Sequence, residues 1–320
     1  MARSKKLEET LSALNAVRSD STTDAATATL QQILSSKFSI AVAQAAKVVA
    51  DAELYDLIPE LVAAFDRLMQ KPVDRDPGCK GKERLADALY RLEFSDERLF
   101  LRGIHHVQME PVWGGTTDTA AGLRGTCALG LVRMNYPEAM VELADLLTDP
   151  EPPARIMAAQ AIAYTENPVG VPLLRLKARL GDENLRVLSE CLTGLLKLAP
   201  DQSLPFVAQH LEAAAATAEV AALALGESRL MTAFPVLKDS WQRSPDQEFR
   251  RVALMSIAML RHDEAIAFLL SLILSGHESE ASGALLALKL YRHEPSLWQR
   301  VEQAAKERAD AAVLKTFEAL

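Results

Sequence analysis

Aromatic residues are scarce in this chain of 320 residues. Phenylalanine, tryptophan and tyrosine make up only 5% of it, although 49% of the residues are hydrophobic. Alanine and leucine supply most of the apolar positions, and both favour helices. A β-sheet core would depend on valine, isoleucine and aromatic side chains. The composition therefore argues against a β-rich class and predicts an all-α protein with a large core.

Cysteine is rare as well, with Cys79, Cys127 and Cys191 as the only three. No two of them have the spacing of a metal site, and an odd number does not suit a disulfide framework. Cys127 and Cys191 lie within apolar helical runs, where free thiols are normally buried. We expect no metal site and reducing, cytoplasmic surroundings.

Long apolar runs and an excess of basic charge are also missing. The longest apolar run, near 265–274, is half of the roughly 20 residues that span a bilayer, so no membrane segment is expected. The first residues, MARSKKLEETLSALN, lack the apolar core of a secretory signal. A net charge of −8 weighs against a general nucleic-acid binder.

The common catalytic motifs are absent from the chain. It contains no G-x-S-x-G, no P-loop and no G-x-G-x-x-G. We therefore predict no catalytic residue and no cofactor, and an enzyme is the less favoured class.

An internal repeat is the strongest pattern in the sequence. Three segments, 123–147, 154–180 and 185–211, each combine an arginine, a helix with small central residues, a turn and a leucine-rich helix. The arginines stand 31 residues apart and the turns contain proline: Arg124, Arg155 and Arg186; Pro137, Pro168 and Pro200. A helical hairpin of this length buries its apolar side only against neighbouring copies, so the repeat predicts a solenoid.

Weaker copies extend the repeat to about eight helical hairpins. We expect capping helices over 1–35, the solenoid over 36–308 and a closing cap over 309–320. The expected fold is an all-α, right-handed α-α superhelix with first helices on its convex face and second helices on its concave face.

Two stretches resemble a known repeat. The pattern D-P-x-x-x-x-R-x-x-A-A-x-A at 149–161 and ALGE at 224–227 resemble HEAT-like repeats, of the short bacterial kind first noted in phycobilin lyases. The resemblance covers roughly 38–305 and implies a HEAT/armadillo-like solenoid. HEAT-like proteins serve as scaffolds, adaptors, lyase subunits and DNA-repair enzymes. They share no catalytic residue, so the resemblance assigns none here.

One stretch, Gly103–Asp118 (GIHHVQMEPVWGGTTD), interrupts the repeat. The loop DPGCKGK (76–82) precedes the first helix of one hairpin, and the end of the interruption precedes the next. Corresponding loops of a solenoid share an edge, so the two should be neighbours. The candidate binding residues there are Cys79, Lys80, Lys82, Arg102, His105, His106, Glu110, Trp113 and Asp118.

The interruption has three interpretations. It is a structural plug with Trp113 inward, a recognition surface anchored by tryptophan and arginine, or a metal or catalytic site. Adjacent His105 and His106 point apart on an extended chain, and H-x-x-x-E is a weak ligand spacing, which disfavours the third. A buried Trp113 would indicate a plug, and a Trp113 beside Lys82 or His105 would indicate a binding site.

A second candidate set consists of arginines one helical turn apart. Arg175 and Arg179 share a face of one second helix, and Arg98 and Arg102 share a face of an earlier one. Such faces suit an acidic peptide or a phosphate backbone, or are simply solvated. The helix between them is acidic at Glu138–Asp145, which favours a protein over nucleic acid.

These patterns predict a non-enzymatic scaffold or adaptor that binds a protein or peptide through its concave face and the 103–118 edge. The first alternative is a tetrapyrrole lyase-like or other small-ligand protein, in which Cys79 and His105 would matter most. The second is a DNA-binding HEAT protein.

Overall fold

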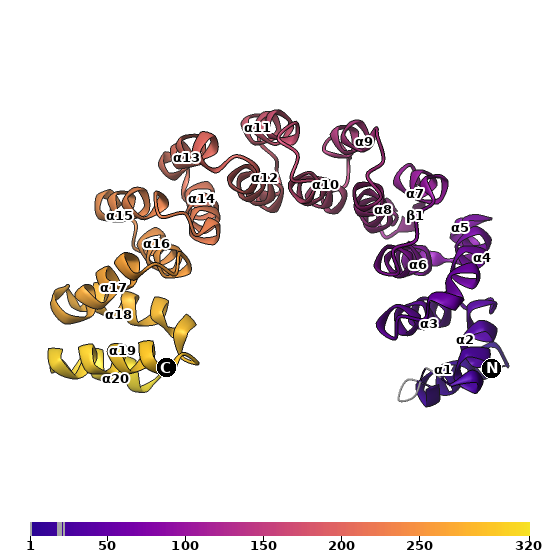
Figure 1. Ribbon diagram of the computed structural model, residues 1–320, viewed down its shortest axis with the longest axis horizontal. Coiled ribbons are helices and arrows are strands. Elements are labelled where there is room, and N and C mark those ends of the chain that lie inside the picture. Colours follow the sequence, from indigo (N-terminus) through magenta and orange to yellow (C-terminus); the bar gives the residue numbers. More distant parts are fainter. Residues whose placement is uncertain (1, 18–20, 22) are drawn as a thin grey trace. The chain divides into compact units, whose positions relative to one another are not determined.

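The computed structural model describes residues 2–17, 21 and 23–320, with the backbone alone for residues 2–4. Residues 18–20 and 22, within the capping segment expected at 1–35, lie outside the described residues. The chain divides into two compact units, of which the first ends at Thr165 and the second runs Glu166–Leu320. Each unit is a stack of helices (Figure 1).

The first unit contains ten α-helices, two short 3-10 helices and two strands within the described residues. They are α1 (Ala2–Val17), α2 (Asp24–Leu34), α3 (Ser39–Asp51), η1 (Tyr55–Leu57), α4 (Ile58–Met69), α5 (Pro72–Arg75), η2 (Pro77–Cys79), α6 (Lys80–Arg91), α7 (Glu97–Ile104), β1 (Met109–Val112), β2 (Gly115–Asp118), α8 (Ala121–Arg133), α9 (Ala139–Leu146) and α10 (Pro152–Tyr164).

The second unit is entirely helical. It comprises α11 (Gly170–Leu180), α12 (Leu185–Leu198), α13 (Pro200–Gln209), η3 (His210–Glu212), α14 (Ala215–Ser228), α15 (Ala233–Arg243), α16 (Gln247–Met259), α17 (Asp263–Ser275), α18 (Glu278–Leu288), η4 (Lys289–Tyr291), α19 (Pro295–Arg308) and α20 (Ala311–Glu318).

Within each unit, first and second helices follow one another as hairpins, from α3 with α4 to α8 with α9 in the first unit and from α12 with α13 to α18 with α19 in the second, with the short α5 outside the series. This arrangement confirms the all-α class and the predicted series of helical hairpins. The expected boundaries of the terminal caps, after residue 35 and before residue 309, stay predictions. No helix among the described residues is both long enough and apolar enough to cross a bilayer.

The two layers of each unit differ from the expected placement. Successive first helices pack directly on one another: α3 on α6, α6 on α8 and α8 on α10 in the first unit, and α12 on α14, α14 on α16 and α16 on α18 in the second. Within each unit they form the inner side of the curve, and the second helices form the outer side (Figure 1). The expectation of convex first helices was therefore wrong. Small side chains allow first helices to approach most closely, which places them where the curve is tightest.

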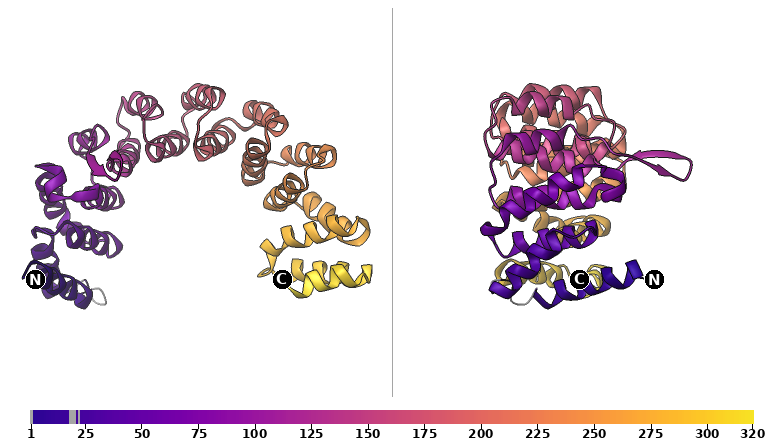
Figure 2. Two further views of the ribbon diagram at one scale, coloured as in Figure 1. Left: turned by 180° about the vertical axis from the view of Figure 1, so that it is seen from behind. Right: turned by 90° about the vertical axis from the view of Figure 1, so that its right-hand side faces the viewer.

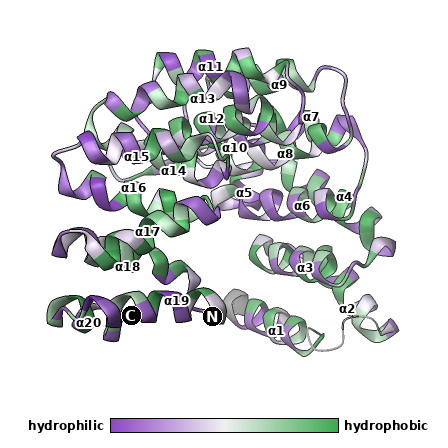
Figure 3. Ribbon diagram, turned by 60° about the vertical axis from the view of Figure 1, so that its left-hand side comes forward, coloured by the Kyte–Doolittle hydropathy of each residue, from purple (hydrophilic) through white to green (hydrophobic). Residues whose placement is uncertain are grey.

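Glycine and alanine make this approach possible. An added Cβ at Gly226 of α14 would lie 2.6 Å from the backbone oxygen of Ser256 on α16. Ala128 and Ala159, from the neighbouring helices α8 and α10, have no solvent exposure. Hydrophobic and hydrophilic residues alternate along the helices of both units (Figure 3), as amphipathic packing requires. Small residues between successive inner helices thus allow their backbones to pack closely.

The interruption of the repeat is a β-hairpin where irregular chain was expected. Strands β1 and β2 pair antiparallel from Met109↔Asp118 to Val112↔Gly115, with Trp113 and Gly114 as the turn. Gly114 has φ +89°, a value that glycine adopts without strain. The hairpin projects away from the helices (Figure 2), and we refer to residues 105–118 as the arm.

Candidate functional site

The base of the arm is tied to the loop before α6. The Glu110 carboxylate accepts hydrogen bonds from the Gly78 backbone N–H (2.7 Å), the Gln108 amide (2.5 Å) and the Thr119 hydroxyl (2.8 Å). The Gln108 amide also donates to the Asp76 carbonyl at 2.9 Å. Gln108 is buried, and its bond to Asp76 is shielded from water, whereas the three bonds to Glu110 are partly buried. The loop 76–82 and the arm are neighbours, as the repeat pattern predicted.

A buried arginine joins the arm to the next two helices. The Arg124 guanidinium lies 2.6 Å from Asp118 and makes two bonds, of 2.7 and 2.8 Å, to the Asp149 carboxylate. It also donates to the His106 carbonyl at 2.9 Å. Arg124 lies in the first turn of α8, and Asp149 precedes α10. The repeat arginine therefore connects one hairpin to the next and holds the arm at the same time.

The carboxyl groups of the base stay ionised to low pH. Burial alone would raise the pKa of Asp118, but the backbone N–H groups of Gln108 and Ala120 and the Arg124 charge outweigh it and lower the pKa. Burial would likewise raise the pKa of Glu110, but the three hydrogen bonds to its carboxylate outweigh burial and lower the pKa. Both side chains are thus permanent acceptors at neutral pH.

A second ion pair lies beneath the base, between Asp76 and Lys82. Neither side chain is exposed, and the Lys82 ammonium lies 3.1 Å from the Asp76 carboxylate. Asp76 also accepts the backbone N–H groups of Gly81 and Lys82, each at 2.9 Å, and so caps the start of α6. Lys82 is therefore a structural cation, beyond the reach of a ligand in solution.

The imidazole of His106 belongs to the same buried cluster. Burial lowers its pKa, although the Gln108 side chain, at 3.2 Å, opposes the shift. A neutral imidazole suits this position because Lys82 and Arg124 are nearby. His106 is consequently a packing and hydrogen-bonding residue of the base.

Cys79 has no solvent exposure. Burial raises its pKa to about 12, so its reactive thiolate form is negligible near neutral pH. Burial also raises the pKa of Cys191 to about 12 and that of Cys127 further still. All three thiols are poor nucleophiles in the folded chain.

We expect a thiol reagent such as DTNB to leave the folded chain almost unmodified from pH 7 to pH 9. Reaction at the three thiols should be at least about tenfold slower than in guanidinium chloride, because the folded chain holds them protonated and covered. A Thr116→Cys variant, with its thiol on the exposed arm, is the control and should react at once. Rapid modification of one thiol in the folded wild type would contradict this assignment of Cys79.

The tip of the arm is apolar and open to solvent. Trp113 is fully exposed, and Val112 beside it is half exposed. Full exposure excludes the interpretation of the interruption as a plug with Trp113 inward, and it separates Trp113 from the buried Lys82. The interpretation as a recognition surface stays a prediction. A two-residue turn at the end of a projecting ribbon places its side chain beyond the reach of the helices. The tryptophan is instead presented to solvent on a supported arm.

A groove of about 470 Å³ runs beside the base of the arm. The arm contributes His105, Val107 and Met109, and the end of α7 contributes Ile104. The far wall is the end of α9 with the loop 149–151. The His105 imidazole lies 2.7 Å from the Glu142 carboxylate across it. Of the two histidines among the candidate binding residues, His105 is thus the one that lines the open groove.

The remaining predicted cations are dispersed. Lys80 pairs with Glu83 on the surface at 2.8 Å, and Arg102 pairs with Asp66 at 2.7 Å. Arg98 is exposed on the same helix, α7. Because α7 is a second helix, Arg98 and Arg102 belong to the outer layer of the first unit, which corrects their expected concave placement.

The arginine pair on α11 lies in the second unit. Arg175 stacks on Phe206 of α13 with its guanidinium carbon 4.2 Å from the ring centroid, and Arg179 lies 5.6 Å from it. α11 is likewise a second helix of the outer layer, so the expected concave placement was wrong here too. The stacking accounts for the Arg175 side chain without a ligand.

Sequence reasoning missed several residues that hold or line the site. They are Asp76, Gln108, Thr119, Arg124 and Asp149 at the base, and Val107, Met109, Glu142, Asp145 and Glu151 in the groove. The arginine series and the D-P pair of the repeat could have indicated Arg124 and Asp149. No local pattern marks the others, because they meet only through tertiary packing.

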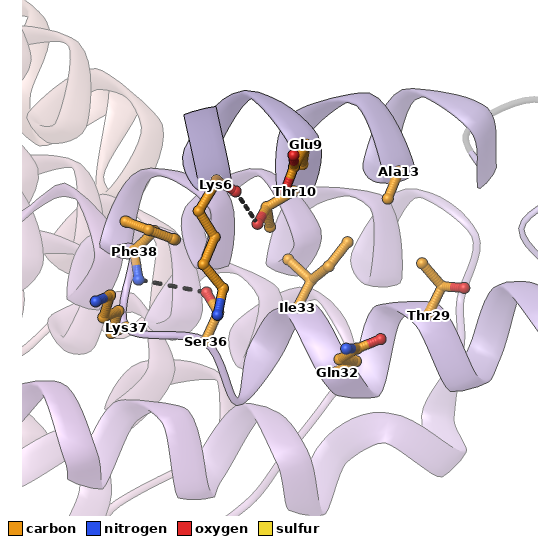
Figure 4. Close-up of a pocket in the computed structure, with 10 residues that line it drawn as sticks. All are labelled: Lys6, Glu9, Thr10, Ala13, Thr29, Gln32, Ile33, Ser36, Lys37 and Phe38. Carbon is orange, nitrogen blue, oxygen red and sulfur yellow. Dashed lines mark hydrogen bonds between the residues drawn. The ribbon is translucent and has the colours of Figure 1, made fainter. Parts of the chain in front are cut away.

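A larger hollow, of about 560 Å³, lies between α1 and α2 at the other end of the first unit. Lys6, Glu9 and Lys37 line it with mixed charge (Figure 4). Among the residues drawn, the Thr10 hydroxyl donates to the Lys6 carbonyl and the Phe38 N–H donates to the Ser36 hydroxyl. None of the residues predicted from the sequence lies there, so we assign the candidate site to the arm.

No group of three or more histidine, cysteine, aspartate or glutamate side chains is placed to hold a metal ion in the described part of the chain. No protein-family model matches the chain, and the search of curated proteins finds no match.

Three solved structures match the chain at low identity and low TM-score. A complex of CpcE and CpcF of phycocyanin lyase from Nostoc sp. PCC7120 matches over 77% of this chain and 91% of that chain, at 16% identity and a TM-score of 0.38. An engineered protein matches over 96% and 91%, at 15% identity and a TM-score of 0.38. Human deoxyhypusine hydroxylase in complex with glycerol matches over 81% and 98%, at 16% identity and a TM-score of 0.32. TM-scores this low carry no argument about activity.

Proposed function

We propose that this chain is a non-enzymatic scaffold that binds a protein or peptide through its arm. The observation that carries the proposal is the fully exposed Trp113 at the tip of a hairpin whose base is buried and bonded. Tryptophan is favoured as an anchor of protein interfaces because it covers a large area with few rotatable bonds. The three buried thiols support a cytoplasmic location.

The buried base supports the proposal through preorganisation. Gln108, Glu110 and Asp118 are each held by several hydrogen bonds, so the arm loses little freedom when a partner binds. A binding element that is rigid beforehand gives up less entropy on association. An apolar tip on a fixed arm is therefore suited to recognition.

The test is selection of binding peptides from a random display library on the full chain. Recovered peptides are synthesised and titrated against wild type and Trp113→Ala. We expect the variant to weaken binding by about thirtyfold, as for an interface anchor worth roughly 2 kcal/mol. Tyr55→Ala, which removes another exposed aromatic ring of the same unit, is the matched control and should change nothing. Peptides that bind Trp113→Ala as well as wild type would rule out the arm.

The tetrapyrrole alternative stays a prediction with a separate test. Its candidate nucleophile, Cys79, is buried with a raised pKa, which weighs against covalent attachment there. Titration with a bilin, followed by absorbance and by mass spectrometry, distinguishes the two classes. A shifted spectrum that Cys79→Ser or His105→Ala abolishes would favour the alternative over the scaffold.

A further inference from the structure

The groove beside the arm has an apolar wall that no part of the described chain covers. Val107 and Met109 remain 59% and 52% exposed on it, and the buried Ile104 and Leu146 form its floor. A partner that covers exposed apolar surface stabilises the complex by about 25 cal/mol for each Å² removed from water. Met109 is paired with Asp118 across the ribbon, so this apolar wall directly adjoins a charged one.

The groove is also strongly acidic. Five carboxylates line the groove, from Asp118, Glu142, Asp145, Asp149 and Glu151, against the single guanidinium of Arg124.

The Arg124 guanidinium does not neutralise all five carboxylates of the groove. Arg124 bonds Asp118 and Asp149, and His105 bonds Glu142. Within the part of the chain that the structure describes, Asp145 and Glu151 have no basic partner. Within the described residues, the carboxylates of Asp145 and Glu151 therefore lie beside the apolar wall without a basic side chain as partner.

We propose that the groove docks a basic peptide segment, with an arginine or lysine side chain between the arm and the end of α9. Its methylene groups would cover Val107 and Met109, and its charged end would lie at Asp145 and Glu151. Long basic side chains combine an apolar stem with a charged head, which matches the two walls of the groove. The inference rests on the proposed function and adds the chemistry of the partner.

The charge and shape of the groove favour this occupant over other cations. A metal ion needs several oxygen ligands at 2.0–2.6 Å, and no such group of side chains is present among the described residues. A small organic cation would leave most of the apolar wall and the nearby Val112 and Trp113 uncovered. A peptide can fill the groove and continue along the arm.

The experiment uses two fluorescein-labelled synthetic hexapeptides on the full chain, one alternating leucine with arginine and one alternating leucine with glutamate. By fluorescence polarisation, the basic peptide should bind at least about tenfold more tightly than the acidic one. Its affinity should fall as NaCl rises from about 50 to about 500 mM, because salt screens exposed charges. Equal binding of both peptides, or binding of neither, would overturn the inference.

The variant Asp145→Asn/Glu151→Gln removes the two free carboxylates without touching the base of the arm. This variant should bind the basic peptide about tenfold more weakly than wild type. Glu97→Gln/Glu138→Gln makes the same change in net charge at exposed positions of the same unit outside the groove, and should have no effect. Equal loss in both variants would show attraction by net charge alone and contradict a docking site.

The outcome separates this inference from the proposed function. If the selected library peptides are not basic and bind the neutralised variant normally, yet lose affinity with Trp113→Ala, the arm binds partners and the inferred chemistry is wrong. If free arginine amide displaces the basic peptide at equal concentration, the groove takes a small cation and the peptide assignment fails.

Discussion

Replacing Arg124 with alanine lowers the free energy of unfolding of the first unit by about 3–5 kcal/mol, because it leaves two buried carboxylates without a cation. Both Asp118 and Asp149 have less than a tenth of their side-chain surface exposed. The change also removes the bond to the His106 carbonyl. Urea denaturation of the full chain, followed by circular dichroism, measures the loss.

Hydrogen exchange locates the effect of Arg124→Ala. Protection should fall most at the backbone N–H groups of Gln108 and Ala120, which Asp118 accepts. Arg102→Ala is the control, since its ion pair with Asp66 is about half exposed on both sides. Such a pair contributes roughly 0–1 kcal/mol. Equal destabilisation by the two variants would mean that the buried network is not what holds the arm.

The same network predicts the direction of acid sensitivity. The pKa values of Asp118 and Glu110 in the folded chain lie below their ordinary values, which in the unfolded chain are near 3.9 and 4.3. Their contribution to stability is therefore complete above about pH 5 and is lost as the pH falls through the folded values. Arm protection in hydrogen exchange should follow this order, and a loss that begins near pH 7 would contradict it.

The second large effect is expected at the ion pair beneath the arm. Asp76→Ala should destabilise the first unit by about 3–5 kcal/mol, because it strands a buried ammonium. It also strands the Gly81 and Lys82 N–H groups, and loss of such a cap costs roughly 1 kcal/mol. Urea denaturation and exchange at the start of α6 measure the result.

Lys82→Met provides the comparison for Asp76→Ala. It removes the charge with little change in volume and leaves Asp76 with both backbone donors, so it should cost less than Asp76→Ala. The double variant should be more stable than Asp76→Ala alone, since no buried cation remains unpaired. Lys80→Met, at an exposed ion pair with Glu83, should stay within about 0.5 kcal/mol of wild type. If the double variant is the least stable of the set, burial of the lone cation is not the main cost.

The repeat explains why the architecture could be predicted from the sequence. Arginines at 124, 155 and 186 and small residues at the centres of first helices recur with a fixed period, and each copy needs its neighbours to bury its apolar side. The same pattern did not specify which helix layer lies inside each unit. The position of each layer depends on how closely the backbones of neighbouring helices approach, as at Gly226 and Ser256. This distance is a property of two packed helices and not of one segment.

The arm shows where sequence reasoning stopped. The Gly-Gly pair at 114–115 is a recognisable hairpin signal, yet the histidines and the glutamate before it suggested a loop with chemistry of its own. The adjacency of loop 76–82 and the arm followed from repeat geometry. Burial of Lys82 and exposure of Trp113 did not, because each depends on distant partners.

By itself, the sequence determined an all-α series of helical hairpins, the burial of Cys127 and Cys191, and the position of one interruption in the repeat. These depend on composition and period, which are local properties. Only the tertiary structure decided that the interruption is an arm with a buried base, an open tryptophan and an acidic groove. The reason is physical: Arg124, Asp149 and Glu110 lie in different segments, and their charges acquire a role only when folding brings them within hydrogen-bond distance of their partners.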